Sequence, residues 1–222
     1  MRHAVSPNRA IRAVLWDFGG VFTDSPFIAF AEFERRRGLP EGFLRRVNST
    51  RADDNAWARF ERGQIALSEF SEAFEAESGA LGHPVRGEEV IALLYGNVRP
   101  GMVAALRRCR QHFRNACLTN NVKTGGTHGL PMTDARAQEV AQIMGLFDLV
   151  IESSLVGARK PEVRFYQIAL ERLEIEAAQA VYLDDLGINL KPARKLGMRT
   201  IKVDSPDQAL RELEAILEIP LA

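Results

Sequence analysis

Five short apolar runs, each continuous rather than alternating with polar residues, constrain the fold of this chain more than any other feature. Runs of this kind are typical of strands buried on both faces of a parallel sheet. Strands that alternate with helices indicate βαβ units, so we predict an α/β fold with a doubly wound parallel sheet. The predicted strands are residues 13–16, 116–119, 147–151, 180–183 and 200–203, and the predicted helices are residues 101–112, 133–144, 161–173, 189–196 and 206–217.

The alternation breaks between residues 25 and 98, where the sequence shows amphipathic helical patterns and no convincing strand. One predicted helix ends at Gly38, a second holds residues 56–60, and a third begins at Ser68 with an acidic residue in its first turn. Phe70 and Phe74, four residues apart in the third helix, are expected to pack inward. We therefore predict two domains: a core of residues 1–24 and 99–222, and a helical insertion of residues 25–98.

The composition narrows the class of protein. The chain has 222 residues, of which 46% are hydrophobic, and its 29 Lys+Arg balance its 29 Asp+Glu. These values are typical of a globular protein and exclude disorder, collagen-like repeats and a disulfide scaffold. Proteins dedicated to nucleic acids carry a basic excess, so we expect no nucleic-acid partner.

We also expect no membrane partner, because no apolar run approaches the ~18–20 residues that a membrane span needs. Residues 1–10 are polar and lack the apolar core of a secretion signal. The two cysteines, Cys109 and Cys117, fit no metal or redox spacing and are expected to be buried or half-buried thiols in a reducing compartment. The expectation is a cytoplasmic monomer or homodimer.

Polar residues follow the predicted strands at the edge where open α/β sheets bind their ligands. They are Asp17 at the start of the segment DFGGV after the first strand, the segment Thr119 to Asn121 after the second, Asp184 and Asp185 after the fourth, and Lys160 before a helix. Each alone fits a turn, a cap or a surface charge. Together they predict a site, because adjacent carboxylates need a cation or a hydrogen-bond network, and three of them favour a hard ion such as Mg²⁺. A lysine and a hydroxyl beside that ion would suit a phosphoryl group.

The segments around these residues resemble the four ordered motifs of the haloacid dehalogenase (HAD) superfamily. They read WDFGGV at 16–21, LTNN at 118–121, RKP at 159–161 and YLDD at 182–185. The stretch DDLGINLKPARKLG at 184–197 looks particularly like the phosphatase-type domain of mammalian soluble epoxide hydrolase, and like the related domain fused to some acyl-CoA dehydrogenases. The resemblance covers nearly the whole chain and implies a Rossmann-like core with an α-helical cap.

The resemblance implies a Mg²⁺-dependent phosphatase that hydrolyses a small phosphomonoester. Asp17 would be the nucleophile and would form an aspartyl-phosphate intermediate. The side chains of Asp17 and Asp185 and the backbone carbonyl of Gly19 would bind Mg²⁺. Asp184 would assist the metal directly or through a metal-bound water.

The same resemblance implies the residues that bind the substrate. Thr119 and the backbone of Asn120 would hydrogen-bond the phosphoryl oxygens, and Gly20 would belong to the substrate-binding loop. Lys160 would neutralise charge on the nucleophile and on the transferring group, and Asn189 would orient these residues. Phosphoryl transfer depends mostly on positioning and charge neutralisation, which fits these roles.

One position departs from the family pattern. Phosphatases of the family usually carry a second Asp two residues after the nucleophile, as the general acid and base, and this chain has Gly19 there. Losing such a group typically costs about 10²–10⁴-fold in rate. We therefore expect a weak enzyme, or one whose substrates are acyl, aryl or anomeric sugar phosphates. Two alternatives stay open: a catalytically lapsed domain that binds or regulates, and a metal-free 2-haloacid dehalogenase-like hydrolase.

The helical insertion is expected to choose the substrate, because a lid over the cleft excludes water and contacts the leaving group. The candidates for such contacts are Asn48, Arg51, Asn55 and Trp57, with Phe22 beside the first motif. Trp57 stands at helical spacing from Phe60, which also fits a place in the core of the insertion.

Overall fold

One parallel sheet of five strands, in the order β3-β2-β1-β4-β5, organises the molecule in a computed structural model that describes residues 10–94, 96–121 and 134–221. The strand β1 lies at the centre, and its last residue Trp16 stands opposite Cys117 of β2 and Leu183 of β4. The predicted doubly wound α/β fold is confirmed. The strands are β1 (Ala13–Trp16), β2 (Arg114–Thr119), β3 (Leu149–Glu152), β4 (Ala180–Asp184) and β5 (Arg199–Lys202).

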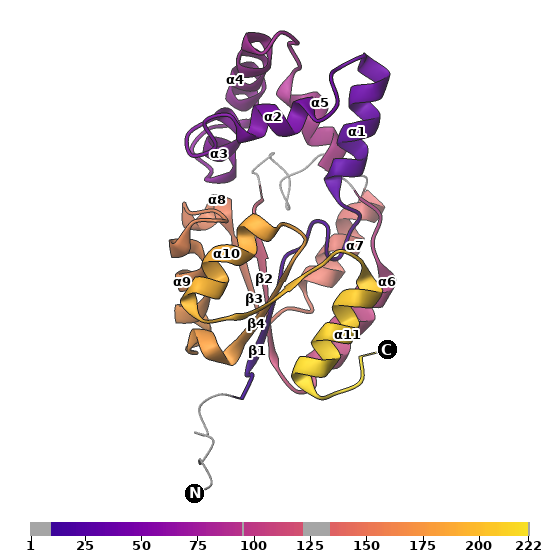
Figure 1. Ribbon diagram of the computed structural model, residues 1–222, viewed down its shortest axis with the longest axis vertical. Helices are drawn as coiled ribbons and strands as arrows, with labels where there is room; N and C mark the ends of the chain where they lie inside the picture. Colours follow the sequence, from indigo (N-terminus) through magenta and orange to yellow (C-terminus); the bar gives the residue numbers. More distant parts are fainter. Residues whose placement is uncertain (1–9, 95, 122–133, 222) are drawn as a thin grey trace, which may run out of the picture.

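Helices cover both faces of the sheet, which explains why the central strand β1 is apolar and buried throughout (Figure 1). Val14 and Trp16 of β1 belong to the hydrophobic cluster on one face, and the alternate residues Ala13 and Leu15 belong to the cluster on the other. The first cluster includes residues of α6 (Pro100–Cys109), α7 (Asp134–Met144) and α11 (Pro206–Leu217). The second includes residues of α9 (Val163–Leu173) and α10 (Gly187–Leu196).

The predicted elements of the core are present with shifted ends. The strand predicted at 147–151 begins at Leu149, because Phe147 packs into the hydrophobic core instead. The helix predicted at 101–112 ends at Cys109, and Thr133, at the start of another, lies outside the described residues. Cys109 and Cys117 are both buried thiols, as predicted. No helix in the described ranges is both long and apolar enough to cross a membrane.

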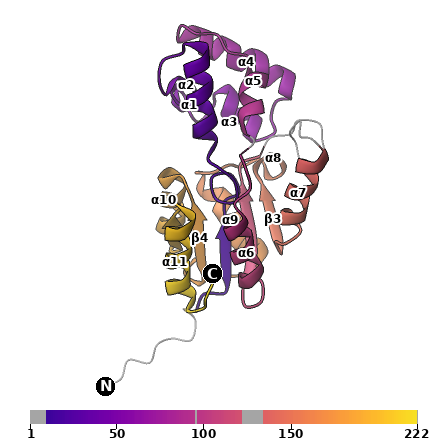
Figure 2. The same cartoon turned by 90° about the vertical axis from the view of Figure 1, so that its right-hand side faces the viewer.

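Five helices between β1 and α6 form a separate cluster beyond the carboxyl edge of the sheet (Figures 1 and 2). Phe70 and Phe74 lie in its hydrophobic core, as predicted, and α1 ends before Gly38, also as predicted. No strand occurs in residues 25–94 or 96–98. The division into domains at residues 25 and 98 stays a prediction. The helices are α1 (Pro26–Arg37), α2 (Phe43–Ser49), α3 (Ala56–Glu61), α4 (Leu67–Ala80) and α5 (Gly87–Ile91), followed by a 3₁₀ turn, η2 (Ala92–Leu94).

The sequence pattern does not predict the helices α2 and α5. The first turn of α2 is capped by a side chain from another helix, because the buried carboxylate of Glu34 accepts hydrogen bonds of 2.8 Å from the backbone N–H groups of Gly42 and Leu44. Such a cap satisfies helix N–H groups that otherwise have no partner. A cap supplied from a distance leaves no local signal at the start of the helix.

The chain enters and leaves the helical cluster along two adjacent segments. Thr23 and Val98 form an antiparallel bridge. The backbone N–H of Asp24 donates to Asn97 O at 2.9 Å, and that of Arg99 donates to Phe22 O at 2.8 Å. The two connections therefore lie directly beside the end of β1, where the first predicted site residue is found.

Candidate active site

Three neighbouring strands bring the predicted site residues to one edge of the sheet. Asp17 follows β1, Thr119 ends β2 and Asp184 ends β4. Lys160 lies between the short helix α8 (Ser153–Val156) and α9. Asp17, Lys160 and Asp184 are 8%, 2% and 0% exposed. Buried charges are costly unless they are paired and hydrogen-bonded, so the partners of these three side chains determine whether the site is stable.

Lys160 joins two of the strand ends through its ammonium group. Its Nζ lies 2.6 Å from Asp17 Oδ1 and 3.0 Å from Asp184 Oδ2. Burial alone would lower the pKa of Lys160, but the charges of Asp17 and Asp184 outweigh it and raise the pKa above its ordinary value. Lys160 therefore stays positively charged beside Asp17.

Asp184 is surrounded by donors from the protein. Oδ1 accepts hydrogen bonds from the Leu186 backbone N–H at 2.7 Å and from Asn189 Nδ2 at 3.1 Å. Oδ2 accepts from Lys160 Nζ and Asn189 Nδ2, each at 3.0 Å, and from the Tyr182 hydroxyl. Because both oxygens are occupied in this way, Asp184 is a buried anchor for Lys160.

Tyr182 is a contact of the site that the sequence reasoning missed. It lies two residues before Asp184 in β4, and residues two apart in a strand share a face. This spacing in the sequence indicates that Tyr182 and Asp184 point to the same face of the sheet. Tyr166 of α9 supports the network from behind, because its hydroxyl donates to the backbone carbonyl of Asn189 at 2.7 Å.

Oxygens of Asp17, Asp184 and Asp185 lie within 4.8 Å of one another. Burial, joined by the charges of Asp184 and Asp185, raises the pKa of Asp17 against the opposing effect of Lys160. Burial and the charge of Asp184 likewise raise the pKa of Asp185, whose Oδ2 accepts a hydrogen bond of 3.1 Å from Ser25 Oγ. Three carboxylates against one ammonium leave an excess of negative charge on hard oxygen ligands, which fits Mg²⁺.

Asn120 contacts Lys160 through its side chain as well as standing beside the site. Its Oδ1 accepts a hydrogen bond of 2.8 Å from the Lys160 N–H, and its Nδ2 donates to the Lys160 carbonyl at 3.1 Å. The resemblance to the family implies a role for Asn120 only through its backbone. Thr119, directly before it, is half-buried at the end of β2.

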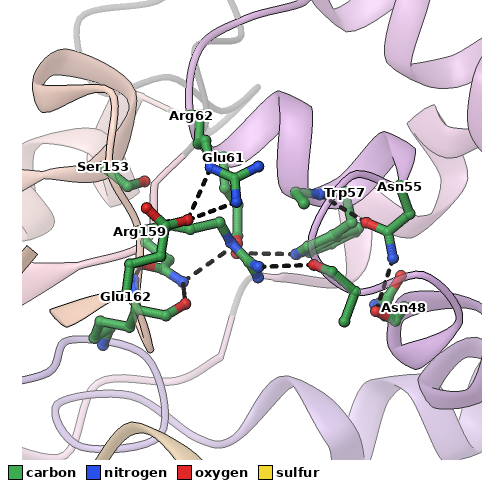
Figure 3. Close-up of polar contacts among 12 residues, drawn as sticks. Asn48, Asn55, Trp57, Glu61, Arg62, Ser153, Arg159 and Glu162 are labelled. Atoms are coloured by element: carbon green, nitrogen blue, oxygen red, sulfur yellow. Dashed lines mark hydrogen bonds and ion pairs between the residues drawn. The ribbon is translucent and has the colours of Figure 1, made fainter. Parts of the chain in front are cut away.

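Four of the five candidate substrate contacts have structural contacts of their own, and those of Asn55 can be followed in Figure 3. Asn55 caps α3, because its Oδ1 accepts from the Ala58 N–H, and its Nδ2 donates to the carbonyls of Asn48 and Thr50. Arg51 forms an exposed ion pair with Asp54 at 2.8 Å. Trp57 packs in the core of the helical cluster against Phe70 and Phe74, and Phe22 is buried in the hydrophobic cluster that includes Trp16. Asn48 Oδ1 is buried with no partner among the described residues.

A model of the family described as haloacid dehalogenase-like hydrolase matches residues 11–197. The chain belongs to this family. Among curated relatives, this HAD-like hydrolase is 35% identical to acyl-CoA dehydrogenase family member 10 of Mus musculus, over 100% of the chain. It is 34% identical to bifunctional epoxide hydrolase 2 of Sus scrofa, over 96% of the chain. The predicted resemblance is thus confirmed.

The chain spans 20% and 40% of the length of those two relatives. A relative of similar length is phosphatase MT3486 of Mycobacterium tuberculosis, 30% identical over 93% of this chain and 95% of that protein. The HAD-like hydrolase therefore matches a part of two larger proteins and nearly the whole of a protein of its own size.

Solved structures confirm the fold. A HAD family enzyme of Bacteroides thetaiotaomicron, in complex with magnesium and inorganic phosphate, is similar with a TM-score of 0.58 at 19% identity, over 87% of this chain and 94% of that one. The L-2-haloacid dehalogenase of Xanthobacter autotrophicus is similar with a TM-score of 0.55 at 20% identity, over 95% and 85%. The fold is shared by an enzyme solved with magnesium and phosphate and by a dehalogenase, so the reaction of this chain must be argued from its own site.

Proposed function

We propose that this HAD-like hydrolase is a Mg²⁺-dependent phosphatase that hydrolyses a small phosphomonoester through an aspartyl-phosphate on Asp17. The observation that carries the proposal is the position of Lys160, whose ammonium bridges the buried carboxylates of Asp17 and Asp184 within 3.0 Å. A cation so placed can neutralise both the attacking carboxylate and the dianionic group it attacks. The named phosphatase among the relatives of similar length supports the same reaction.

Asp17 would be the attacking group, and the protein holds one of its carboxylate oxygens in place. Lys160 Nζ and the Phe18 N–H both contact Oδ1, at 2.6 Å each, in the part of the chain that the structure describes. In the first step a carboxylate oxygen of Asp17 bonds to phosphorus while the bond between phosphorus and the leaving oxygen breaks. In the second step the oxygen of water bonds to phosphorus while the bond between phosphorus and the Asp17 oxygen breaks; both protons of the water leave on the inorganic phosphate, and Asp17 is restored as a carboxylate.

The remaining residues would hold the reacting groups in place. Asp17, Asp185 and the Gly19 carbonyl would bind Mg²⁺, which supplies charge neutralisation on the transferring group. Thr119, the Asn120 backbone and Gly20 would orient the phosphoryl oxygens. Asn189 would act through Asp184, which its amide contacts on both oxygens. We assign Asp184 to anchoring Lys160 because its oxygens already accept hydrogen bonds from the protein.

Gly19 sets the substrate preference within this proposal. A glycine has no side chain to protonate the departing oxygen, so substrates with stable leaving anions should react fastest. Aryl, acyl and anomeric sugar phosphates are of this kind. We also propose that residues 25–98 act as the cap over the core of residues 1–24 and 99–222, so that water is excluded during the reaction.

Hydrolysis of an aryl phosphate, with Mg²⁺ and after its removal by a chelator, tests the proposal. The expected result is turnover that is lost on chelation and restored by added Mg²⁺. Equal turnover without metal would contradict the proposal. Absence of turnover in both conditions would favour the catalytically lapsed domain, and release of halide from a 2-haloacid without metal would favour the dehalogenase.

A further inference from the structure

Two ion pairs connect the end of α3 in the helical cluster to residues 159–162 of the core (Figure 3). Arg159 Nε lies 2.5 Å from Glu61 Oε2, and Arg62 donates to Glu162 Oε1 from Nη2 at 2.6 Å and from Nε at 2.8 Å. The backbones approach closely here, because a Cβ at Gly63 would lie 2.6 Å from the carbonyl oxygen of Ser154. The two pairs therefore connect the same two parts of the molecule, and each joins one arginine to one glutamate, but Glu61 is more buried than Glu162.

The two pairs differ in what else they contact. Glu61 is 7% exposed, and its Oε2 also accepts a hydrogen bond of 3.2 Å from Asn120 Nδ2. Its Oε1 accepts from Trp57 Nε1 at 2.9 Å. Both arginines also donate to a backbone carbonyl, Arg159 to Ala52 at 3.2 Å and Arg62 to Asp53 at 2.8 Å, but among the described residues the pair of Arg62 and Glu162 has no hydrogen bond to Asn120.

The contact with Asn120 leads to the reacting groups. The Asn120 amide holds the N–H and the carbonyl of Lys160, at 2.8 and 3.1 Å, and the ammonium of Lys160 lies between Asp17 and Asp184. A continuous series of hydrogen bonds thus joins a side chain of the helical cluster to Lys160. Displacements of about 1 Å at a reacting group can change rates by about a hundredfold, so such a series matters to catalysis.

We propose that Glu61 is a positioning residue, contributed by the helical cluster, that holds Lys160 in place through Asn120; its catalytic consequence rests on the proposed function. A carboxylate suits this role because it accepts hydrogen bonds from three donors: the Trp57 indole, the Arg159 guanidinium and the Asn120 amide. A glutamine has one acceptor oxygen and an NH₂ group that would face a donor. Loss of the contact between Glu61 and Asn120 should therefore loosen Lys160 through the Asn120 amide.

The first test is independent of activity and compares Glu61→Gln with the matched control Arg62→Gln. Each variant removes one charge from one of the two ion pairs. The measurement is amide hydrogen exchange of Lys160, whose N–H donates to Asn120 Oδ1. We expect exchange about tenfold faster in Glu61→Gln and unchanged in Arg62→Gln. Unchanged exchange in Glu61→Gln, or equal acceleration in both variants, would overturn the proposal.

The second test uses the kinetics of an aryl phosphate with Mg²⁺. We expect kcat of Glu61→Gln to fall by about tenfold or more with a smaller change in KM, because the interaction acts on the reacting groups. Arg62→Gln should keep the wild-type kcat. An equal loss of kcat in both variants would show that Glu61 is only a structural contact and would contradict the proposal. A wild-type protein without turnover would contradict the proposed function but leave the exchange result standing.

A third variant covers the case in which Glu61→Gln does not fold. Trp57→Phe keeps an aromatic ring against Phe70 and removes the indole N–H that contacts Glu61 Oε1, together with part of the ring system. It should accelerate the exchange of Lys160 in the same direction and by less. Wild-type exchange at Lys160 in a folded Trp57→Phe protein would overturn the proposal.

Discussion

The backbone of Gly20 lies so close to Asp185 that a Cβ at this glycine would stand 2.2 Å from Oδ2 of the carboxylate. Gly20 also has a φ of 74°, in the left-handed region that side chains rarely adopt. Both observations require glycine, and the first connects the loop after Asp17 to a proposed metal ligand. Any side chain at position 20 must push Asp185 away.

The first prediction concerns Gly20→Ala. We expect a loss of stability of about 1–3 kcal/mol from backbone strain, and a fall in Mg²⁺ affinity because Asp185 is displaced. Thermal unfolding and Mg²⁺ titration measure the two effects. Gly101→Ala is the matched control, since a Cβ there meets nothing within 4 Å. A Gly20→Ala protein with the stability and Mg²⁺ affinity of that control would contradict the account.

The second prediction concerns Gly19→Asp. A Cβ at Gly19 meets nothing within 4 Å, so the position can accept a side chain. The new carboxyl would act as a general acid, and we expect turnover of alkyl phosphates to rise by about tenfold or more. Turnover of aryl phosphates should change less, because their leaving groups need little protonation.

Gly19→Asn is the control for this experiment, because asparagine has nearly the same shape and no transferable proton. Initial rates on matched alkyl and aryl phosphates give the comparison. An equal gain in both variants would show that the effect is steric. Absence of any gain with Asp on alkyl phosphates would contradict the view that Gly19 limits leaving-group protonation.

The third prediction concerns pH. Burial and neighbouring carboxylates raise the pKa of Asp17 and of Asp185 in the folded chain without metal. The folded state therefore holds these protons at pH values where the unfolded chain has lost them, and their contribution to stability declines as pH rises through the raised values. Mg²⁺ competes with the same protons, so its stabilising effect should grow with pH.

Thermal unfolding with and without Mg²⁺ measures this effect. At a concentration of 100 times its Kd, a ligand contributes about 2.7 kcal/mol, and we expect the Mg²⁺-induced rise in Tm to be larger at about pH 7.5 than at about pH 5. Asp185→Asn should reduce the rise. A shift that is equal at both pH values would contradict binding at these carboxylates.

The sheet and the place of the site could be predicted because both depend on local patterns. Continuous apolar runs follow from burial on both faces, and Asp17, Thr119 and Asp184 stand at strand ends whatever surrounds them. The contacts that required the folded chain are those between distant segments. Glu34 caps α2, and Glu61 reaches Asn120 and Arg159, which lie 59 and 98 residues away in the sequence.

Asn55 illustrates why the choice of substrate contacts was harder. Its residue type fits both a ligand contact and a helix cap, and only the positions of Ala58, Asn48 and Thr50 show that its side-chain atoms are used within the helical cluster. The charge of Arg159 likewise does not show from the sequence whether it contacts a ligand or another side chain of the protein. The sequence places it beside Lys160, but its ion pair with Glu61 depends on how α3 meets the core.

The measurement that tests the central claim most directly is mass spectrometry of the enzyme quenched with acid during turnover of an aryl phosphate. The account predicts a phosphoryl group on the peptide that contains Asp17, formed only with Mg²⁺ and absent from Asp17→Asn, which should also lose turnover. Wild-type turnover by Asp17→Asn, or a phosphoryl group on a different residue, would contradict the account.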